Sequence, residues 1–172
     1  LGGGLANTCL AAKGFDVGGA LIEESSLMYA KELIKNPKII VPETVVVSDS
    51  PEKKGRVIHV NSLNKNESIF DIAPEALYEL KPIIQNSGTI LWNGPIGFFE
   101  KENFARGTLM IADMIVASKS FSVLGGGDTI AAAEKAGVID KIDYVSTAGG
   151  AFLEFMEGKK LPAVEALMDK FN

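Results

Sequence analysis

Hydrophobic positions along the chain fall into short strand-like runs that alternate with longer stretches of helical spacing. The strand-like runs are expected at residues 38–47, split in two by Pro42, and at residues 56–60, 89–92, 121–124 and 144–146. Helical stretches are expected at residues 5–13, 27–34, 74–86, 104–118, 129–136 and 150–157, and a last helix begins at Pro162. Strands that alternate with helices are typical of parallel sheets covered by helices. The pattern therefore predicts an α/β fold, a three-layer α/β/α Rossmann-like domain with a mainly parallel sheet.

Two details refine this assignment. Pro82 should kink the helix at residues 74–86, because proline lacks an N–H group and its ring clashes with the preceding turn. The run at residues 56–60 is expected to lie near a sheet edge.

Length and composition describe an ordinary globular chain. The 172 residues fit one domain, which we take as residues 1–172. Hydrophobic residues make up 47%, charged residues 23%, and the formal net charge is −5. Nucleic-acid binding usually needs a basic face, and no apolar run reaches the ~18 residues of a membrane helix, so we expect neither nucleic acid nor a membrane as a partner. The single cysteine, Cys9, excludes an internal disulfide and fits a cytoplasmic protein.

Glycine-rich loops follow three of the expected strands. They span residues 93–97, 125–129 and 147–150, and a fourth glycine run, at residues 2–4, precedes the first helix. The carboxyl ends of parallel strands meet at one edge of a sheet, where ligands of open α/β folds bind. Glycine lets the backbone approach a ligand closely, and a helix N-terminus adds N–H groups and a positive dipole end. Several such loops at one edge favour a polyphosphate ligand over a single carboxylate.

Each of these loops also has a simpler interpretation, because a glycine loop after a strand is often only a tight turn. Asp128 is either a helix N-cap or a ligand of Mg²⁺, which prefers oxygen ligands, and Thr129 could donate to phosphate. Glu100 is either a surface charge or an acceptor for ribose hydroxyls, and Phe98 is either core or part of a ligand wall. Neither G-x-x-x-x-G-K-[ST] nor G-x-G-x-x-G is present, which argues against an ordinary P-loop and a standard dinucleotide site.

Together these motifs resemble the phosphoglycerate kinase family, in its order and spacing. They are Gly2-Gly3-Gly4, the run WNGPIGFFE at residues 92–100 with FARGT at 104–108, GGGDT at 125–129, and STAGGA at 146–151 with Leu153-Glu154 and Glu157-Gly158-Lys159. The resemblance spans essentially the whole chain. It covers most of the family's C-terminal, nucleotide-binding domain.

The resemblance implies a glycolytic kinase, a phosphotransferase with a carboxyl group as acceptor. Such an enzyme transfers a phosphoryl group between 1,3-bisphosphoglycerate and ADP, with ADP or ATP and Mg²⁺ as cofactors. By the same resemblance, the adenine would be flanked by Gly3, Gly4 and Phe70, and the rest of the nucleotide site would be lined by Asn93, Pro95 and Phe98. The ribose would be held by Glu100, the phosphates would be contacted by Gly126, Gly127 and Thr129, and magnesium would be bound by Asp128. The transferring phosphoryl group would be stabilised by Gly149 and Gly150.

The sequence departs from the family in two ways. Ala148 stands where the family usually has glycine, which would cost about 1 kcal/mol if this residue needed a positive φ. The family's phosphate-contacting lysines and its acceptor-binding N-terminal domain lie outside these residues, and the chain begins at Leu1 without a methionine. We therefore expect a domain truncated at its start and inactive alone. In the full-length enzyme, expected to be a monomer, phosphoglycerate would bind through the missing domain.

Three other functions stay open at this point. The first is a nucleotide- or sugar-phosphate-binding module without a kinase role. The second is a Rossmann-type oxidoreductase, which a titration with ADP and NAD would distinguish. The third is a structural interaction protein, which would bind no nucleotide.

Overall fold

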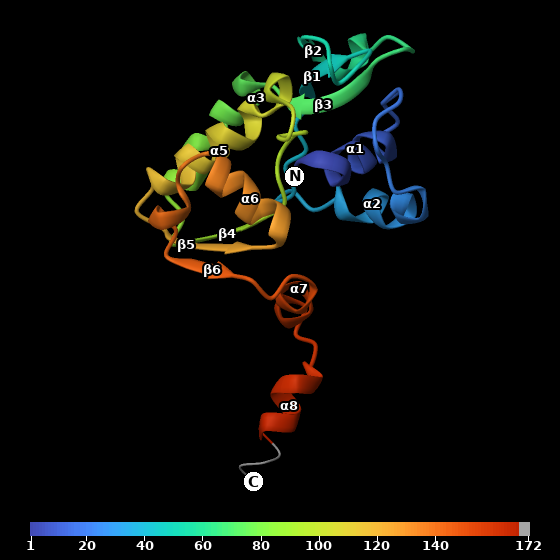
Figure 1. Ribbon diagram of the computed structural model, residues 1–172. Coiled ribbons are helices and arrows are strands. Elements are labelled where there is room, and N and C mark those ends of the chain that lie inside the picture. The colour runs from blue at the N-terminus through green and yellow to red at the C-terminus, as the bar shows by residue number, and fades with distance from the viewer. Residues whose placement is uncertain (169–172) are drawn as a thin grey trace.

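The computed structural model describes residues 1–168, and its helices and strands follow the expected alternation over most of that length (Figure 1). In chain order they are α1 (Gly3–Ala12), α2 (Leu27–Leu33), β1 (Thr44–Ser48), β2 (Arg56–His59), β3 (Ser68–Ile72), α3 (Pro74–Tyr78), α4 (Lys81–Gln85), β4 (Thr89–Asn93), α5 (Arg106–Val116), β5 (Phe121–Gly125), α6 (Gly127–Lys135), β6 (Tyr144–Ser146), α7 (Gly150–Met156) and α8 (Pro162–Met168). Short 3-10 turns occupy Glu24–Ser26, Val60–Ser62, Glu102–Phe104 and Ile139–Lys141.

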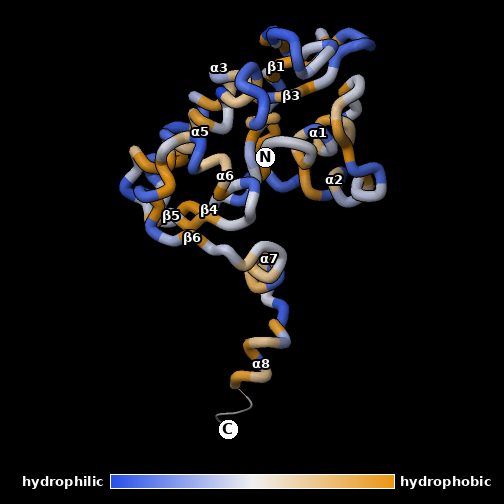
Figure 2. Tube along the Cα trace, in the orientation of Figure 1, coloured by the Kyte–Doolittle hydropathy of each residue, from blue (hydrophilic) through white to orange (hydrophobic). Residues whose placement is uncertain are grey.

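The C-terminal strands form a parallel sheet, which confirms the expected α/β fold. Strand β5 lies between β4 and β6, and both pairings are parallel. Helices α5 and α6 connect these strands and pack on one face of the sheet, where Trp92 and Leu124 join a buried core with Ile111 and Ala132. In Figure 2, hydrophobic residues are prominent in β4 and β5.

The opposite face of the parallel sheet carries the alternate residues of the same strands. Leu91, Phe121 and Tyr144 are exposed on it, since successive strand residues point to opposite faces. Within residues 1–168, the core helices therefore cover one face of this sheet, and an apolar surface remains on the other.

A second sheet is antiparallel, in the order β2-β1-β3, and the sequence pattern did not predict it. The run at residues 38–47 forms one strand, β1, instead of the two expected, because Pro42 cannot donate to a ladder and residues 38–43 stay irregular. Strand β2 lies at the sheet edge, as expected. Strand β3 was missed, since its apolar residues are interrupted by Asp71 and preceded by a polar stretch.

Proline and glycine act at the expected places in the helices, with small shifts of boundary. The stretch at residues 74–86 is broken into α3 and α4, and Pro82 lies in the first turn of α4. Helix α1 begins at Gly3, two residues earlier than expected, so the glycine run is partly helical. Cys9 is fully buried in the second core, in the same cluster as Val45 and Val47 of β1.

Helices α7 and α8 extend away from the two sheets (Figure 1). Several of their apolar side chains are exposed, among them Phe155, Leu167 and Met168. Phe152 anchors α7, because its ring packs on Gly125 where any side chain would overlap it. The start of α7 is thereby held beside the loop that follows β5.

Candidate functional site

A cavity of about 900 Å³ opens where α1, β3 and β4 meet. It brings together eight of the residues singled out from the sequence, from four separate segments of the chain. They are Gly3, Gly4, Phe70, Asn93, Pro95, Phe98, Glu100 and Asp128. Polar groups are few among its lining residues, and apolar side chains such as Leu21, Ile69 and Leu91 make up much of the wall. A concave, mainly apolar site with a few polar groups is the usual form of a cofactor pocket.

The loop at residues 93–100 forms one side of the cavity, and hydrogen bonds from three other elements hold it. The Gly3 N–H donates to the Ile96 carbonyl (2.8 Å), and the Phe98 N–H donates to the Phe70 carbonyl on β3 (2.7 Å). The buried Thr108 hydroxyl of α5 accepts from the N–H groups of Ile96 (3.1 Å) and Gly97 (3.2 Å). Thr108 was not identified from the sequence, because a threonine inside a helix gives no sign of a partner twelve residues away.

Two aromatic rings, one of them from this loop, line the cavity. Phe70 and Phe98 are stacked, with ring centroids 6.2 Å apart and planes 26° apart, and Phe98 is 37% exposed. Phe98 is therefore part of the cavity wall, while the adjacent Phe99 is buried in the core. Glu100 closes the loop as an exposed carboxylate on the cavity lining.

The glycine loop after β5 is joined to the loop after β4 by side-chain hydrogen bonds. The Asn93 amide donates to the Gly125 carbonyl (2.7 Å). The Thr129 hydroxyl donates to the same carbonyl (2.8 Å) and accepts from the Gly94 N–H (2.7 Å). Thr129 is 1% exposed, and its hydroxyl serves the link between the two loops.

Helix α6 begins with N–H groups ahead of its own hydrogen-bond ladder. Gly126 is the N-cap with φ 95°, a conformation that favours glycine, and the first ladder bond runs from the Ile130 N–H to the Gly126 carbonyl (3.0 Å). The N–H groups of Gly127, Asp128 and Thr129 precede that bond and form the positive end of the helix dipole. Gly126, Gly127 and Thr129 do not line the cavity; they stand next to Asp128, which does.

Asp128 is the second residue of α6 and not its N-cap. Its side chain is exposed on the cavity lining, and within residues 1–168 its carboxylate has no hydrogen-bond or ion-pair partner. An unpaired carboxylate beside helix N–H groups has the oxygen chemistry that Mg²⁺ prefers when phosphates and water complete its shell. In the described part of the chain, no three His, Cys, Asp or Glu side chains gather in a group that could hold a metal ion.

Gly149 and Gly150 lie outside the cavity lining, at the start of α7. Gly149 is the N-cap, with φ 53°, and a side chain on either glycine would meet open space. The preceding Ala148 has no positive φ, because within residues 1–168 every residue with a positive φ is glycine. The alanine therefore carries none of the strain considered from the sequence.

Asp71 is a buried carboxyl group on the cavity lining that sequence analysis missed. It is 3% exposed, and its two oxygens accept from the N–H groups of Gly107 (2.8 Å) and Ile72 (2.9 Å). Burial raises the pKa of this carboxyl to about 7, although the two N–H groups act to lower it. The sequence feature that could have revealed it is an aspartate inside the apolar run of β3.

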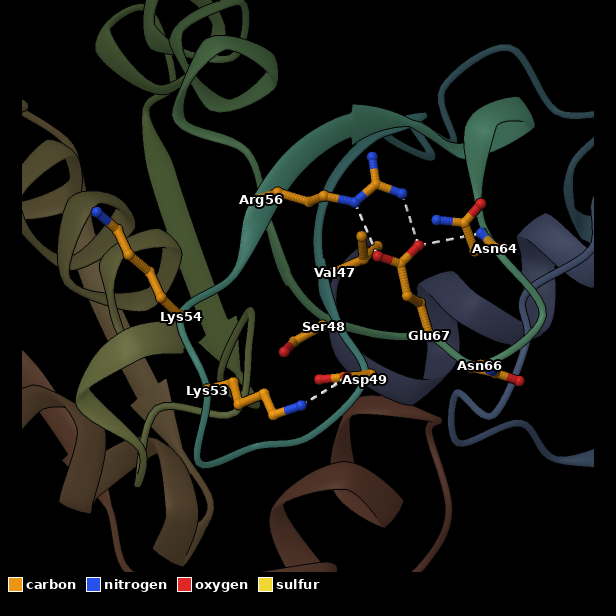
Figure 3. A pocket seen from close by; sticks show the side chains of 9 residues that line it. All are labelled: Val47, Ser48, Asp49, Lys53, Lys54, Arg56, Asn64, Asn66 and Glu67. Carbon is orange, nitrogen blue, oxygen red and sulfur yellow. Dashed lines mark hydrogen bonds and ion pairs between the residues drawn. The ribbon is translucent and has the colours of Figure 1, made fainter.

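A second hollow, of about 500 Å³, lies on the antiparallel sheet (Figure 3). Its cations are mostly neutralised by carboxylates of the same hollow. Arg56 forms a bidentate pair with Glu67 (2.7 and 2.6 Å) and holds the pKa of Glu67 down to about 2, and Lys53 pairs with Asp49 (2.7 Å). This hollow is thus less suited to an anion than the glycine loops are.

Comparisons with known proteins agree on one family. A family model described as phosphoglycerate kinase matches residues 1–159. The chain is 46% identical over 170 residues to a phosphoglycerate kinase of Baumannia cicadellinicola subsp. Homalodisca coagulata, covering 99% of the chain and 44% of the relative. It is also 46% identical over 177 residues to a phosphoglycerate kinase of Francisella tularensis subsp. novicida (strain U112), covering 99% and 45%.

Solved structures give the same result. The phosphoglycerate kinase from Coxiella burnetii matches 98% of the chain with a TM-score of 0.91 at 43% identity, and the match covers 45% of that structure. The phosphoglycerate kinase from Pyrococcus horikoshii OT3 matches 97% with a TM-score of 0.82 at 34% identity, covering 44% of that structure. The chain spans less than half the length of the relatives it matches. Within residues 1–168, no helix is both long and apolar enough to cross a membrane.

Proposed function

The chain belongs to the phosphoglycerate kinase family, and we propose that it is the nucleotide-binding part of such a kinase. It binds Mg·ADP or Mg·ATP for reversible phosphoryl transfer between 1,3-bisphosphoglycerate and ADP, a cytoplasmic step of glycolysis. One observation carries the proposal: eight residues from four segments converge on a single cavity beside the start of α6. Residues 1–172 form the C-terminal domain, and the acceptor site belongs to the other part of a monomeric enzyme.

The cavity offers the nucleoside an apolar floor and a polar rim. Gly3 and Gly4 lack side chains where the flat base would lie, and Phe70 supplies an aromatic ring to the same cavity lining. Asn93, Pro95 and Phe98 line the path from the base to α6. The Glu100 carboxylate at the loop end accepts hydrogen bonds from ribose hydroxyls.

The start of α6 holds the phosphates. The N–H groups of Gly127, Asp128 and Thr129 point out of the helix end, where an anion is favoured by both hydrogen bonding and the dipole. Gly126 allows the turn that presents them. The links through Asn93 and Thr129 hold this turn at a fixed distance from the base-binding loop.

The exposed carboxylate of Asp128 fits magnesium, and it would hold the ion where the phosphates lie. Bound Mg²⁺ supplies positive charge to the phosphate oxygens during transfer. Gly149 and Gly150 at the start of α7 add N–H donors on the side of the transferring group. Phosphoryl transfer depends mainly on positioning and electrostatics, so these donors need no side-chain nucleophile beside them.

Calorimetric titration with ADP, with and without Mg²⁺, tests this proposal on the wild type and on two variants. Asp128→Ala should weaken Mg·ADP binding by about tenfold or more, equivalent to at least 1.4 kcal/mol, and should change magnesium-free ADP binding much less. Asp113→Ala, on the exposed side of α5, is the matched control and should bind like the wild type. Equal losses with and without magnesium would refute the role of Asp128. Binding of NAD in preference to ADP, or of neither, would refute the proposed function.

A further inference from the structure

The Asp71 carboxylate lies in a space that two glycines leave open. A side chain at Gly97 or at Gly107 would overlap its Oδ1 atom. Gly97 belongs to the cavity loop, and Gly107 to the first turn of α5. The carboxylate therefore fills the junction where β3, the loop and α5 come closest.

Hydrogen bonds connect this junction to the middle of the cavity loop, residues 96–98. Asp71 accepts from the Gly107 N–H, which fixes the first turn of α5 on β3. The next residue of that turn is Thr108, whose hydroxyl accepts from the N–H groups of Ile96 and Gly97. On the other side of Asp71, the Phe70 carbonyl accepts from the Phe98 N–H. The carboxylate thus lies between the hydrogen bonds that join β3 and α5 to the middle of the loop.

We propose that Asp71 is the positioning residue of the nucleotide loop: its carboxylate holds the first turn of α5 so that Thr108 can hold the loop. Its effect on a ligand passes through Pro95 and Phe98, which line the cavity on either side of the loop residues that Thr108 binds. The inference rests on the proposed function for the identity of the ligand. The state of the loop itself can be measured without any ligand.

The charge of Asp71 is part of this role. Both oxygens of the ionised carboxylate accept, so it satisfies the N–H groups of Gly107 and Ile72. When the carboxyl is protonated, one of these oxygens carries the proton and becomes a hydroxyl donor. Burial raises its pKa, and the groups that face it are these two backbone N–H groups. The charged side chains on the surrounding segments, Arg106 on α5 and Glu100 on the loop, are both exposed. The loop should therefore loosen as the pH falls below about 7.

Amide hydrogen exchange at pH 8 tests the inference on Asp71→Asn, which keeps the volume and removes one acceptor. The amides of Ile96, Gly97 and Phe98 should exchange about tenfold faster or more than in the wild type, and ADP should bind about tenfold more weakly. Amides of the β1–β2 ladder should not exchange faster. Asp143→Asn is the matched control, because Asp143 also accepts from a backbone N–H, that of Ser122, on a strand away from the loop. It should leave the loop amides and ADP binding unchanged.

Two further measurements keep the test decisive if Asp71→Asn folds poorly. Thr108→Val removes the acceptor of the loop and leaves Asp71 in place, so it should reproduce the faster exchange at Ile96 and Gly97. In the unaltered chain, protection of the same amides, corrected for the intrinsic rate, should fall between pH 8 and pH 5.5. Unchanged loop protection in both the variant and the pH series would overturn the inference, even if ADP binds. Failure of the wild type to bind ADP would overturn the proposed function but leave the exchange result to decide the role of Asp71.

Discussion

Asp71→Asn should make the chain more stable at neutral and alkaline pH, although it loosens the cavity loop. Burial raises the pKa of this carboxyl from its ordinary 3.8 to about 7. At any pH between these two values, the Asp71 carboxyl keeps its proton in the folded chain but has released it in the unfolded chain. Stability contributed by this group is fully present below pH 3.8 and is lost as the pH rises through 7. The asparagine variant has no such loss.

The magnitude follows from the size of the shift. A change from 3.8 to about 7 is roughly three pKa units, and at 1.36 kcal/mol each this corresponds to about 4 kcal/mol of unfolding free energy. Below pH 4 a protonated carboxyl and an amide each offer one acceptor to the two N–H groups, so the wild type and the variant should be about equally stable. Above pH 7 the variant should be more stable by up to about 4 kcal/mol, with relaxation of the site reducing this value.

Urea unfolding at pH 4.5, 6 and 8 measures the difference, with the emission of Trp92, the single tryptophan, as the signal. The stability gap between variant and wild type should widen steadily across the three values. A gap that stays constant with pH would refute the reasoning, because it would mean that Asp71 ionises at its ordinary pKa in the folded chain. A variant less stable than the wild type at pH 8 would refute it as well.

Three other outcomes are expected. Thr129→Val should lower the free energy of unfolding by about 1–3 kcal/mol, because the Gly94 N–H loses its acceptor, while Thr129→Ser should retain most of the stability in urea unfolding. ADP should change the emission of Trp92, whose Nε1 donates to the Gly94 carbonyl (2.8 Å), and binding seen by calorimetry without any emission change would contradict the placement of the loop. In a coupled phosphoglycerate kinase assay the chain alone should be at least ~10⁵-fold slower than a phosphoglycerate kinase relative, because the proposed acceptor site lies outside these residues, and activity within about tenfold would contradict this.

The parallel half of the fold was predictable because its signals are local. The apolar runs that became β4, β5 and β6 are short and each is followed by a glycine-containing loop, and the helices between them have clear spacing. The antiparallel sheet was not predictable in the same way. Its pairing of β1 with β3 depends on contacts between separate segments, and the polar residues within and before β3 hid the strand.

For the candidate site as well, some features could be predicted from the sequence and others could not. The convergence of Gly3, Phe98 and Asp128 on one cavity agrees with loops that share the ligand-binding edge of the fold. The supporting contacts could not be found from sequence, since Asp71 meets Gly107 across 36 positions and Gly94 meets Thr129 across 35. Sequence also could not show that the Thr129 hydroxyl is used inside the protein, or that Ala148 needs no positive φ.

The claim that the cavity beside α6 takes the nucleotide is tested most directly by mapping amide chemical shifts during a titration with Mg·ADP. We predict that the largest changes fall on Gly4, Phe98 and Gly127, which come from three segments around one site. Residues of the second hollow, such as Arg56 and Asn64, should stay unchanged. Changes centred on that second hollow, or no saturable change anywhere, would contradict the account.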